Sequence, residues 1–258
     1  MIILLPHLYS PIRMRKIAKF VSAIVVLVLF AAIILYYPQL YYFDYKLKYK
    51  NFILYSDKRI PREADSLLDK VDFKIKRSPL YNQEPTVKIF LRSNYNIHNI
   101  LPYQFAAQPF AITRPLIRNI FISKGDISSN LSFKPSGASR ALDQIITHEI
   151  VHVMIENKIP FTARADELNW SPMGFLWKEE GYADYIAGNP TMSLEEGLAV
   201  LSGKTSQYDR YEFEYFKYWF AVKYLIECEK LDIDVLLQTP ISLGDSLAKA
   251  LKVRQEPP

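Results

Sequence analysis

The feature that most constrains the fold is a His-Glu-x-x-His pentapeptide at residues 148–152, inside an apolar run that predicts a largely buried helix. A helix turns by about 100° per residue, so side chains four residues apart lie on one face. His148 and His152 can therefore bind the same metal ion, with Glu149 beside them. Because unpaired polar groups are costly to bury, a metal is the simplest partner for this pair. Two imidazoles with a neighbouring carboxylate are typical of hydrolytic zinc sites.

A second segment, residues 177–185, supplies a candidate third ligand. Glu180 and Asp184 are four residues apart, so on a helix they lie on one face. Glu180 can complete a three-ligand zinc site that leaves a fourth position for water. Asp184 can accept a hydrogen bond from the second ring nitrogen of His148, because metal-binding histidines often donate to a carboxylate.

The neighbours of Glu180 leave one alternative open. Glu179 is the competing ligand, although it would point about 100° away on the helix. Gly181 and Ala183 are small, so they allow a second helix to approach closely around an ion. Taken alone, the carboxylates of this segment could equally form an acidic, solvated helix face. Their pairing with the pentapeptide favours the metal site.

The two segments, H-E-I-V-H and W-K-E-E-G-Y-A-D-Y, together resemble the gluzincin metallopeptidases, the thermolysin-like and aminopeptidase-like zinc hydrolases. The resemblance implies a zincin-like fold that binds one Zn²⁺ per chain and cleaves a peptide or protein substrate. It implies that His148, His152 and Glu180 are the zinc ligands. Glu149 would be the general base, and Asp184 would orient a ligand.

Other family features narrow this resemblance. The gap between the two segments is longer than in the aminopeptidases, and their G-x-M-x-N strand is absent, which argues for an endopeptidase. The resemblance implies that a strand at residues 118–123 borders the cleft, where an extended peptide could add as a further strand. The E-x-x-A-D string also resembles membrane-embedded zinc peptidases that process CAAX proteins or membrane-protein fragments, but those usually have several spans.

A tyrosine-rich helix predicted at residues 208–229 offers the donor that would stabilise the oxyanion. Tyr215 is the preferred candidate, and Tyr211 is nearly as good. The other aromatic residues there lie at helical spacing and are mostly expected in the core. His98, in an irregular segment at residues 94–109, is more simply a solvent-exposed bystander.

Residues 20–37 are uncharged and strongly apolar, and the charge-free stretch continues to residue 43. That length can cross a bilayer as a helix. A cleaved signal peptide is the alternative, but the apolar run is long and no small-x-small cleavage site follows it. A short basic segment, residues 1–19, precedes the span and slightly favours a cytoplasmic N-terminus. We therefore expect a single-pass membrane protein with its catalytic domain on the extracytoplasmic side.

The remainder, residues 45–258, predicts one α+β domain with a small mixed sheet followed by a mainly helical half. A 50% apolar and 14% aromatic composition indicates a folded protein. Basic residues are scattered and no nucleic-acid-binding module is recognisable, so we expect no nucleic-acid partner. The single cysteine, Cys228, is expected in the core. The predicted elements are strands at 51–55, 86–91 and 118–123 and helices at 61–77 and 137–157.

The sequence thus predicts a membrane-anchored zinc metallopeptidase of unknown oligomeric state. One alternative is a catalytically idle relative that uses the same fold as a binding or regulatory module at the membrane. The intact Glu149 argues against this alternative, because inactive relatives commonly lose the base. Another alternative is a membrane-anchored helical scaffold without a metal, which metal analysis would separate from the other two.

Overall fold

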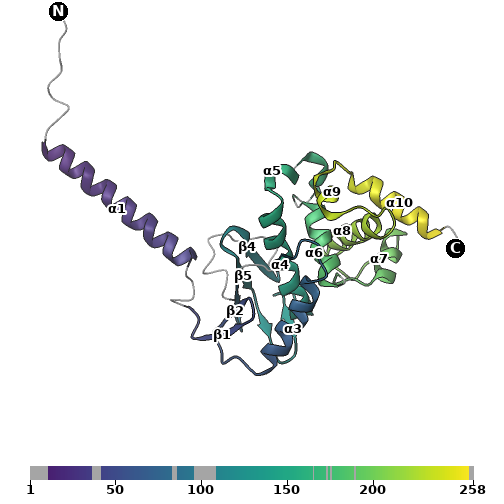
Figure 1. Cartoon of the computed structure of the whole chain (residues 1–258), viewed down its shortest axis with the longest axis horizontal. Coiled ribbons are helices and arrows are strands. Elements are labelled where there is room, and N and C mark those ends of the chain that lie inside the picture. Colours follow the sequence, from purple (N-terminus) through teal and green to yellow (C-terminus); the bar gives the residue numbers. More distant parts are fainter. Residues whose placement is uncertain are drawn as a thin grey trace, which may run out of the picture. The chain divides into compact units, whose positions relative to one another are not determined.

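The computed structural model describes residues 11–36, 42–82, 86–95, 109–164, 166–172, 174, 176–188 and 190–255. The chain divides into two compact units, Met1–Phe43 and Asp44–Pro258. Figure 1 shows the elements of both units. His98 and most of the irregular segment around it lie outside the described residues.

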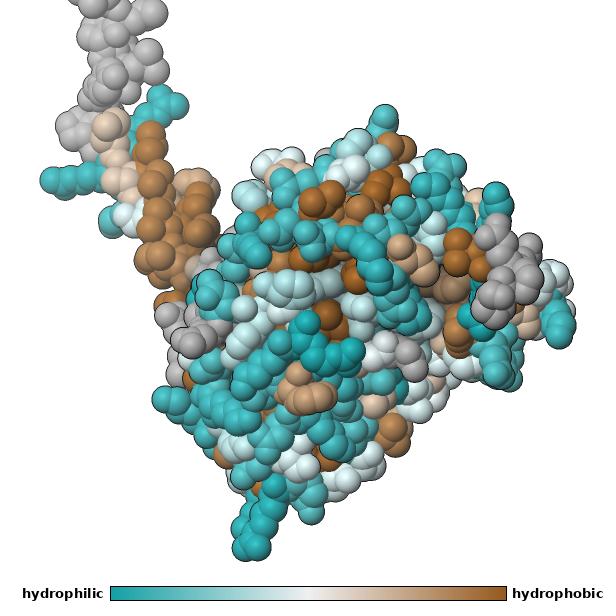
Figure 2. Space-filling model, turned by 45° about the vertical axis from the view of Figure 1, so that its right-hand side comes forward, coloured by the Kyte–Doolittle hydropathy of each residue, from teal (hydrophilic) through white to brown (hydrophobic). Residues whose placement is uncertain are grey.

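The first unit contains helix α1, Pro11–Tyr36. Its 26 residues extend over about 39 Å, more than the roughly 30 Å of a bilayer's hydrocarbon core. Arg13–Ile33 is the one described segment long and apolar enough to cross a membrane, and none of its apolar window is buried. The apolar side chains are exposed along this helix (Figure 2). An N-terminal signal sequence would have the same length and composition, so the membrane anchor stays a prediction. The cytoplasmic location of the N-terminus is a prediction as well.

The second unit begins with a mixed sheet of five strands in the order β1-β2-β3-β5-β4. The strands β2, β3 and β5 are parallel, and an antiparallel strand flanks them on each side. Helix α3 lies between β2 and β3 in the chain and buries its apolar face in the core. The bounds are β1 Tyr45–Tyr49, β2 Phe52–Ser56, α3 Glu63–Ile75, β3 Val87–Leu91, β4 Ala111–Arg114 and β5 Asn119–Ile122.

A small three-stranded sheet leads into helix α4, which carries the pentapeptide. Its strands are β6 Gly125–Asp126, β7 Leu131–Phe133 and β8 Ser139–Ala141. Helix α4, Leu142–Lys158, has the larger sheet on one side and the later helices on the other (Figure 1). Most of α4 is buried because both sides are covered.

The rest of the unit is helical, as predicted. Helix α6 packs against both α4 and α8, so the pentapeptide helix and the second motif helix are direct neighbours. The bounds are α5 Phe161–Arg164, α6 Trp177–Ala187, α7 Leu194–Leu201, α8 Arg210–Glu227, α9 Ile233–Gln238 and α10 Leu243–Gln255, with short 3-10 helices at Pro115–Ile117 and Glu167–Asn169.

The structure confirms the α+β class and the mixed sheet, and it corrects several elements. The strand predicted at residues 118–123 is present as β5, but it is not the edge strand, because β4 pairs with its outer side. The helix predicted from residue 137 begins at Leu142, since Ser139–Ala141 pairs with β7. Cys228 is exposed at the end of α8 rather than buried, because the core-facing side of that helix ends before it.

Candidate metal centre

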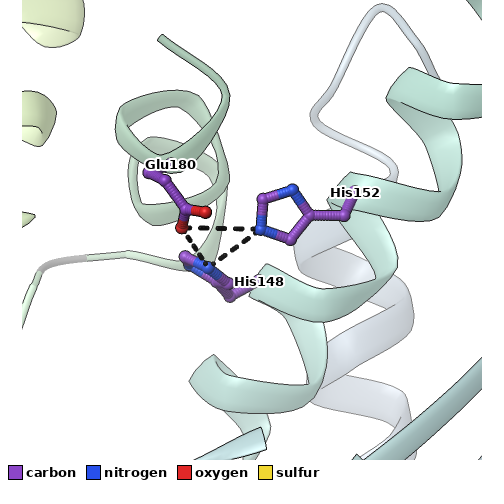
Figure 3. Close-up of side chains that lie close together, drawn as sticks. All are labelled: His148, His152 and Glu180. Atoms are coloured by element: carbon purple, nitrogen blue, oxygen red, sulfur yellow. Dashed lines mark hydrogen bonds and ion pairs between the residues drawn. The ribbon is translucent and has the colours of Figure 1, made fainter. Parts of the chain in front are cut away.

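The side chains of His148, His152 and Glu180 converge between α4 and α6 (Figure 3). The two histidine Nε2 atoms lie 3.2 Å apart. Glu180 Oε2 lies 3.2 Å from Nε2 of His148 and 3.6 Å from Nε2 of His152. Four ligand atoms at about 2.0–2.1 Å from a tetrahedral zinc ion are about 3.3–3.4 Å from one another. The three atoms thus have the separation of three tetrahedral ligands, and this group could hold a metal ion.

Asp184 lies behind His148, as the sequence predicts. Its Oδ1 atom is 2.8 Å from Nδ1 of His148 and 2.8 Å from Nη2 of Arg140. The Asp184 side chain is completely buried. Burial raises its pKa, but Arg140 and His148 outweigh that effect and hold the pKa below its usual value. Asp184 is therefore a carboxylate that fixes the ring of His148 from the side opposite Glu180.

The protonation of the two histidines reflects the carboxylates around them. Burial lowers the pKa of His148, but Asp184 and Glu180 outweigh it and raise this pKa to about 9. The pKa of His152 is also raised against burial, chiefly by the charge of Glu180. The two imidazoles in turn lower the pKa of Glu180, although burial opposes this. Without a metal, the group therefore holds its positive charge as protons, which a bound cation would displace.

Glu149 lies next to the three candidate ligands and is almost completely buried. Its carboxylate accepts a hydrogen bond from the hydroxyl of Thr113, on the edge strand β4. Thr113 Oγ1 is also 3.3 Å from the main-chain oxygen of Glu149. Thr113 could not be identified from the sequence, because no local pattern shows that a residue of β4 contacts α4.

Tyr215 on α8 lies close to the same group. Its ring centroid is 6.2 Å from that of His148. Burial raises the pKa of its phenol well above the usual value, and the charges of Glu180, Asp184 and Glu149 raise it further. The hydroxyl group therefore stays protonated and can donate a hydrogen bond. Tyr211 lines the same cavity as Tyr215.

A cavity of about 920 Å³ opens onto these groups. Strand β4 and the residues around it form one wall, and the first turns of α8 form another. Residues from α4 and α6, including both histidines, Glu149 and Glu180, are among the polar groups that line the cavity. The candidate metal centre is therefore accessible to a ligand as large as a short peptide segment.

Glu179 does not belong to the three-residue group. Its Oε2 atom lies 3.9 Å from Nδ1 of His152, the ring nitrogen that does not contact Glu180. Its Oε1 atom accepts a hydrogen bond from Nε of Arg164. The structure therefore places the two adjacent glutamates around His152 on different ring nitrogens.

No model of a known protein family matches this chain, and no curated protein sequence matches it. The gluzincin resemblance stays a prediction that rests on the two motifs and the residues described above.

Proposed function

We propose that this protein is a membrane-anchored zinc endopeptidase of the gluzincin type, with a zincin-like catalytic domain. The observation that carries the proposal is the tetrahedral spacing of His148, His152 and Glu180, with separations of 3.2, 3.2 and 3.6 Å. Two imidazoles and one carboxylate, with room for a further ligand, are a donor set that suits catalytic zinc. The adjacent Glu149 in an accessible cavity adds the base that such chemistry requires.

Each group has a separate role in the proposed reaction. His148, His152 and Glu180 would hold the zinc ion, which supplies Lewis acidity towards water and the scissile carbonyl. Glu149 accepts the proton of the attacking water and later donates it to the leaving amine. The Thr113 hydroxyl holds the Glu149 carboxylate in position.

The Tyr215 hydroxyl group is the proposed donor to the developing oxyanion. It is protonated because its pKa lies well above neutrality. Its ring lies against His148, so the hydroxyl belongs to the same cavity as Glu149. A fixed donor in a partly buried cavity stabilises charge more strongly than water does.

Strand β4 is the proposed binding edge for the substrate. It pairs with β5 on one side and ends the order of the five-stranded sheet, so no other strand among the described residues pairs with its outer side. An extended peptide can add to such an edge through main-chain hydrogen bonds. Because β4 also lines the cavity, a peptide bound there would pass the candidate metal centre. The proposed peptide-binding edge is therefore Ala111–Arg114 and not the strand at residues 118–123 expected from the sequence.

The proposed location is a membrane surface, with α1 as the single span. Basic residues both precede and follow the apolar segment, and the excess before it is small. We propose a cytoplasmic N-terminus and an extracytoplasmic catalytic unit, following the positive-inside rule. Protease protection of the second unit in sealed vesicles tests this orientation: digestion from the cytoplasmic side would contradict it.

The decisive experiment combines zinc analysis with peptide-library cleavage by the full chain in detergent. We expect about one zinc ion per chain in the wild type and in Glu149→Gln. The Glu149→Gln variant should lose cleavage by a factor on the order of 10²–10⁴, because the proton acceptor is gone. A wild-type chain without zinc would refute the proposal. Bound zinc with equal cleavage by both proteins would instead favour the idle binding module.

A further inference from the structure

Both candidate histidine ligands have a buried carboxylate and a buried arginine on the side away from Glu180. Behind His148 these are Asp184 and Arg140. The Oδ1 atom of Asp184 lies 2.8 Å from Nδ1 of His148 and 2.8 Å from Nη2 of Arg140. Behind His152 they are Glu179 and Arg164: the carboxylate lies 3.9 Å from Nδ1 and accepts a hydrogen bond from the guanidinium. Both carboxylates come from α6, whereas Arg140 lies in β8 and Arg164 ends α5, so the two arginines come from separate parts of the chain.

Arg164 holds the Glu179 carboxylate in place. Its side chain is 5% exposed, so its charge requires partners within the protein. Besides Glu179, the guanidinium donates to the carbonyl of Ile159 and to the carboxylate of Glu156. With these partners on three sides, Arg164 has little freedom to move. The Glu179 carboxylate is consequently fixed on the Nδ1 side of His152.

We propose that Glu179 is a positioning residue for His152, as Asp184 is for His148. This inference rests on the proposed metal site. A carboxylate near Nδ1 favours the neutral imidazole tautomer that is protonated at Nδ1. The lone pair of Nε2 is then free to bind a metal ion. Its negative charge also makes the imidazole a better donor to the metal. Both ligating histidines would then be oriented by buried carboxylates from α6.

The distances set the expected strength of this effect. A separation of 3.9 Å is that of an ion pair and exceeds a hydrogen bond by about 1 Å. Asp184, at 2.8 Å, is in direct hydrogen-bond contact with its histidine. Loss of a carboxylate behind a ligating histidine typically weakens metal binding about 10–100-fold. We expect Glu179 to act near the lower end of that range and Asp184 nearer its upper end.

Two other roles for Glu179 need to be separated from this one. As a metal ligand, Glu179 would be needed for stoichiometric binding, yet its oxygen faces Nδ1 whereas Glu180 faces Nε2. As a purely structural partner of Arg164, it would act like Glu156, which contacts the same guanidinium. Glu156→Gln is therefore a matched control, because it removes one carboxylate from Arg164 and leaves Glu179 beside His152.

The first measurement is zinc affinity of the full chain in detergent, by competition with a chromophoric chelator. Glu179→Gln should bind one zinc ion about tenfold more weakly than wild type, while Glu156→Gln should stay within about threefold. The inference is overturned if Glu179→Gln also stays within about threefold, or if both variants weaken binding equally. Complete loss of zinc binding by Glu179→Gln would instead identify Glu179 as a metal ligand, which also overturns the inference.

The second measurement is the ¹⁵N–¹H correlation spectrum of the histidine rings, which does not depend on activity. The chain has four histidines, and the His152 signals can be assigned from His152→Ala. In the zinc-free chain, Glu179→Gln should shift the Nδ1 proton of His152, whereas Glu156→Gln should leave it unchanged. Equal spectra for wild type and Glu179→Gln would overturn the inference. If the wild-type chain binds no zinc, the proposed function is refuted. The histidine spectrum would still test whether Glu179 interacts with Nδ1 of His152.

Discussion

The substitution Gly181→Ala tests whether the candidate site depends on the close packing of α6 against α8. A Cβ atom at residue 181 would lie 2.4 Å from the main-chain oxygen of Tyr218 and 2.7 Å from Cγ2 of Val222. Real Cβ contacts are essentially never shorter than 3.0 Å, so the helices would have to separate by at least about 0.6 Å. Most of the contact is with main chain, which cannot rotate away as a flexible side chain could.

The cost of this substitution has two opposing parts. Overpacking of a tight interior typically costs about 1–3 kcal/mol. Replacing glycine by alanine within a helix stabilises that helix by up to about 1 kcal/mol. We therefore expect Gly181→Ala to lower the free energy of unfolding by up to about 2 kcal/mol. The adjacent Glu180 would move with α6, so zinc affinity should fall as well.

The matched control is Gly244→Ala, in the first turn of α10. There, the new Cβ would lie 3.7 Å from Oγ of Ser242, an ordinary van der Waals contact. Urea denaturation of both variants, in detergent and with a chelator present, measures stability without any contribution from zinc. Gly244→Ala should equal or slightly exceed wild type. Equal stability of Gly181→Ala and Gly244→Ala would refute the argument from close packing.

Three further predictions concern the groups around the candidate metal. Thr113→Val should lower kcat/KM about tenfold without changing zinc affinity, because Glu149 loses a hydrogen bond; steady-state cleavage of a library-derived peptide measures this. Tyr215→Phe should also keep zinc affinity but lower kcat/KM by about 10²-fold in the same assay, as expected for a lost oxyanion donor. In the zinc-free chain, the raised His148 pKa contributes stability that is complete below its ordinary value of 6.5 and lost as pH rises through about 9. Urea midpoints between pH 6 and 10 with a chelator should follow this decline, and Asp184→Asn should flatten it.

The candidate ligands could be predicted because they depend mainly on local helical geometry. The four-residue spacing of His148 and His152 fixes their common face whatever the rest of the fold does. The same spacing in α6 puts Asp184 one turn from Glu180, and their contacts with His148 agree with that geometry. These inferences require only that both segments be helical and adjacent.

The elements that were missed depend on contacts between distant parts of the chain. Strand β4 has only four residues, three of them half-buried, so it has no strong alternation of its own. Strand β1 contains two lysines and is largely exposed, and its pairing with β2 is what makes it a strand. The contact of Thr113 with Glu149 follows from the packing of β4 on α4, for which the sequence contains no local signal. The wall of the cavity was therefore harder to predict than the residues of the candidate metal centre.

The charges around the site give an independent reason to expect a divalent cation. With both imidazoles neutral, the carboxylates exceed the guanidinium groups, and this excess lies in a buried environment where uncompensated charge is costly. A divalent cation would balance this excess negative charge, and so would protonation of both histidines. The same negative charge raises the pKa of His148 and of His152 when no metal is bound. Metal binding and double protonation then leave the same net charge in the site, and the two states compete directly. The groups counted are the four carboxylates of Glu149, Glu179, Glu180 and Asp184 and the two guanidinium groups of Arg140 and Arg164. Glu156, the second carboxylate on Arg164, is not counted because its side chain is 24% exposed, so water screens its charge.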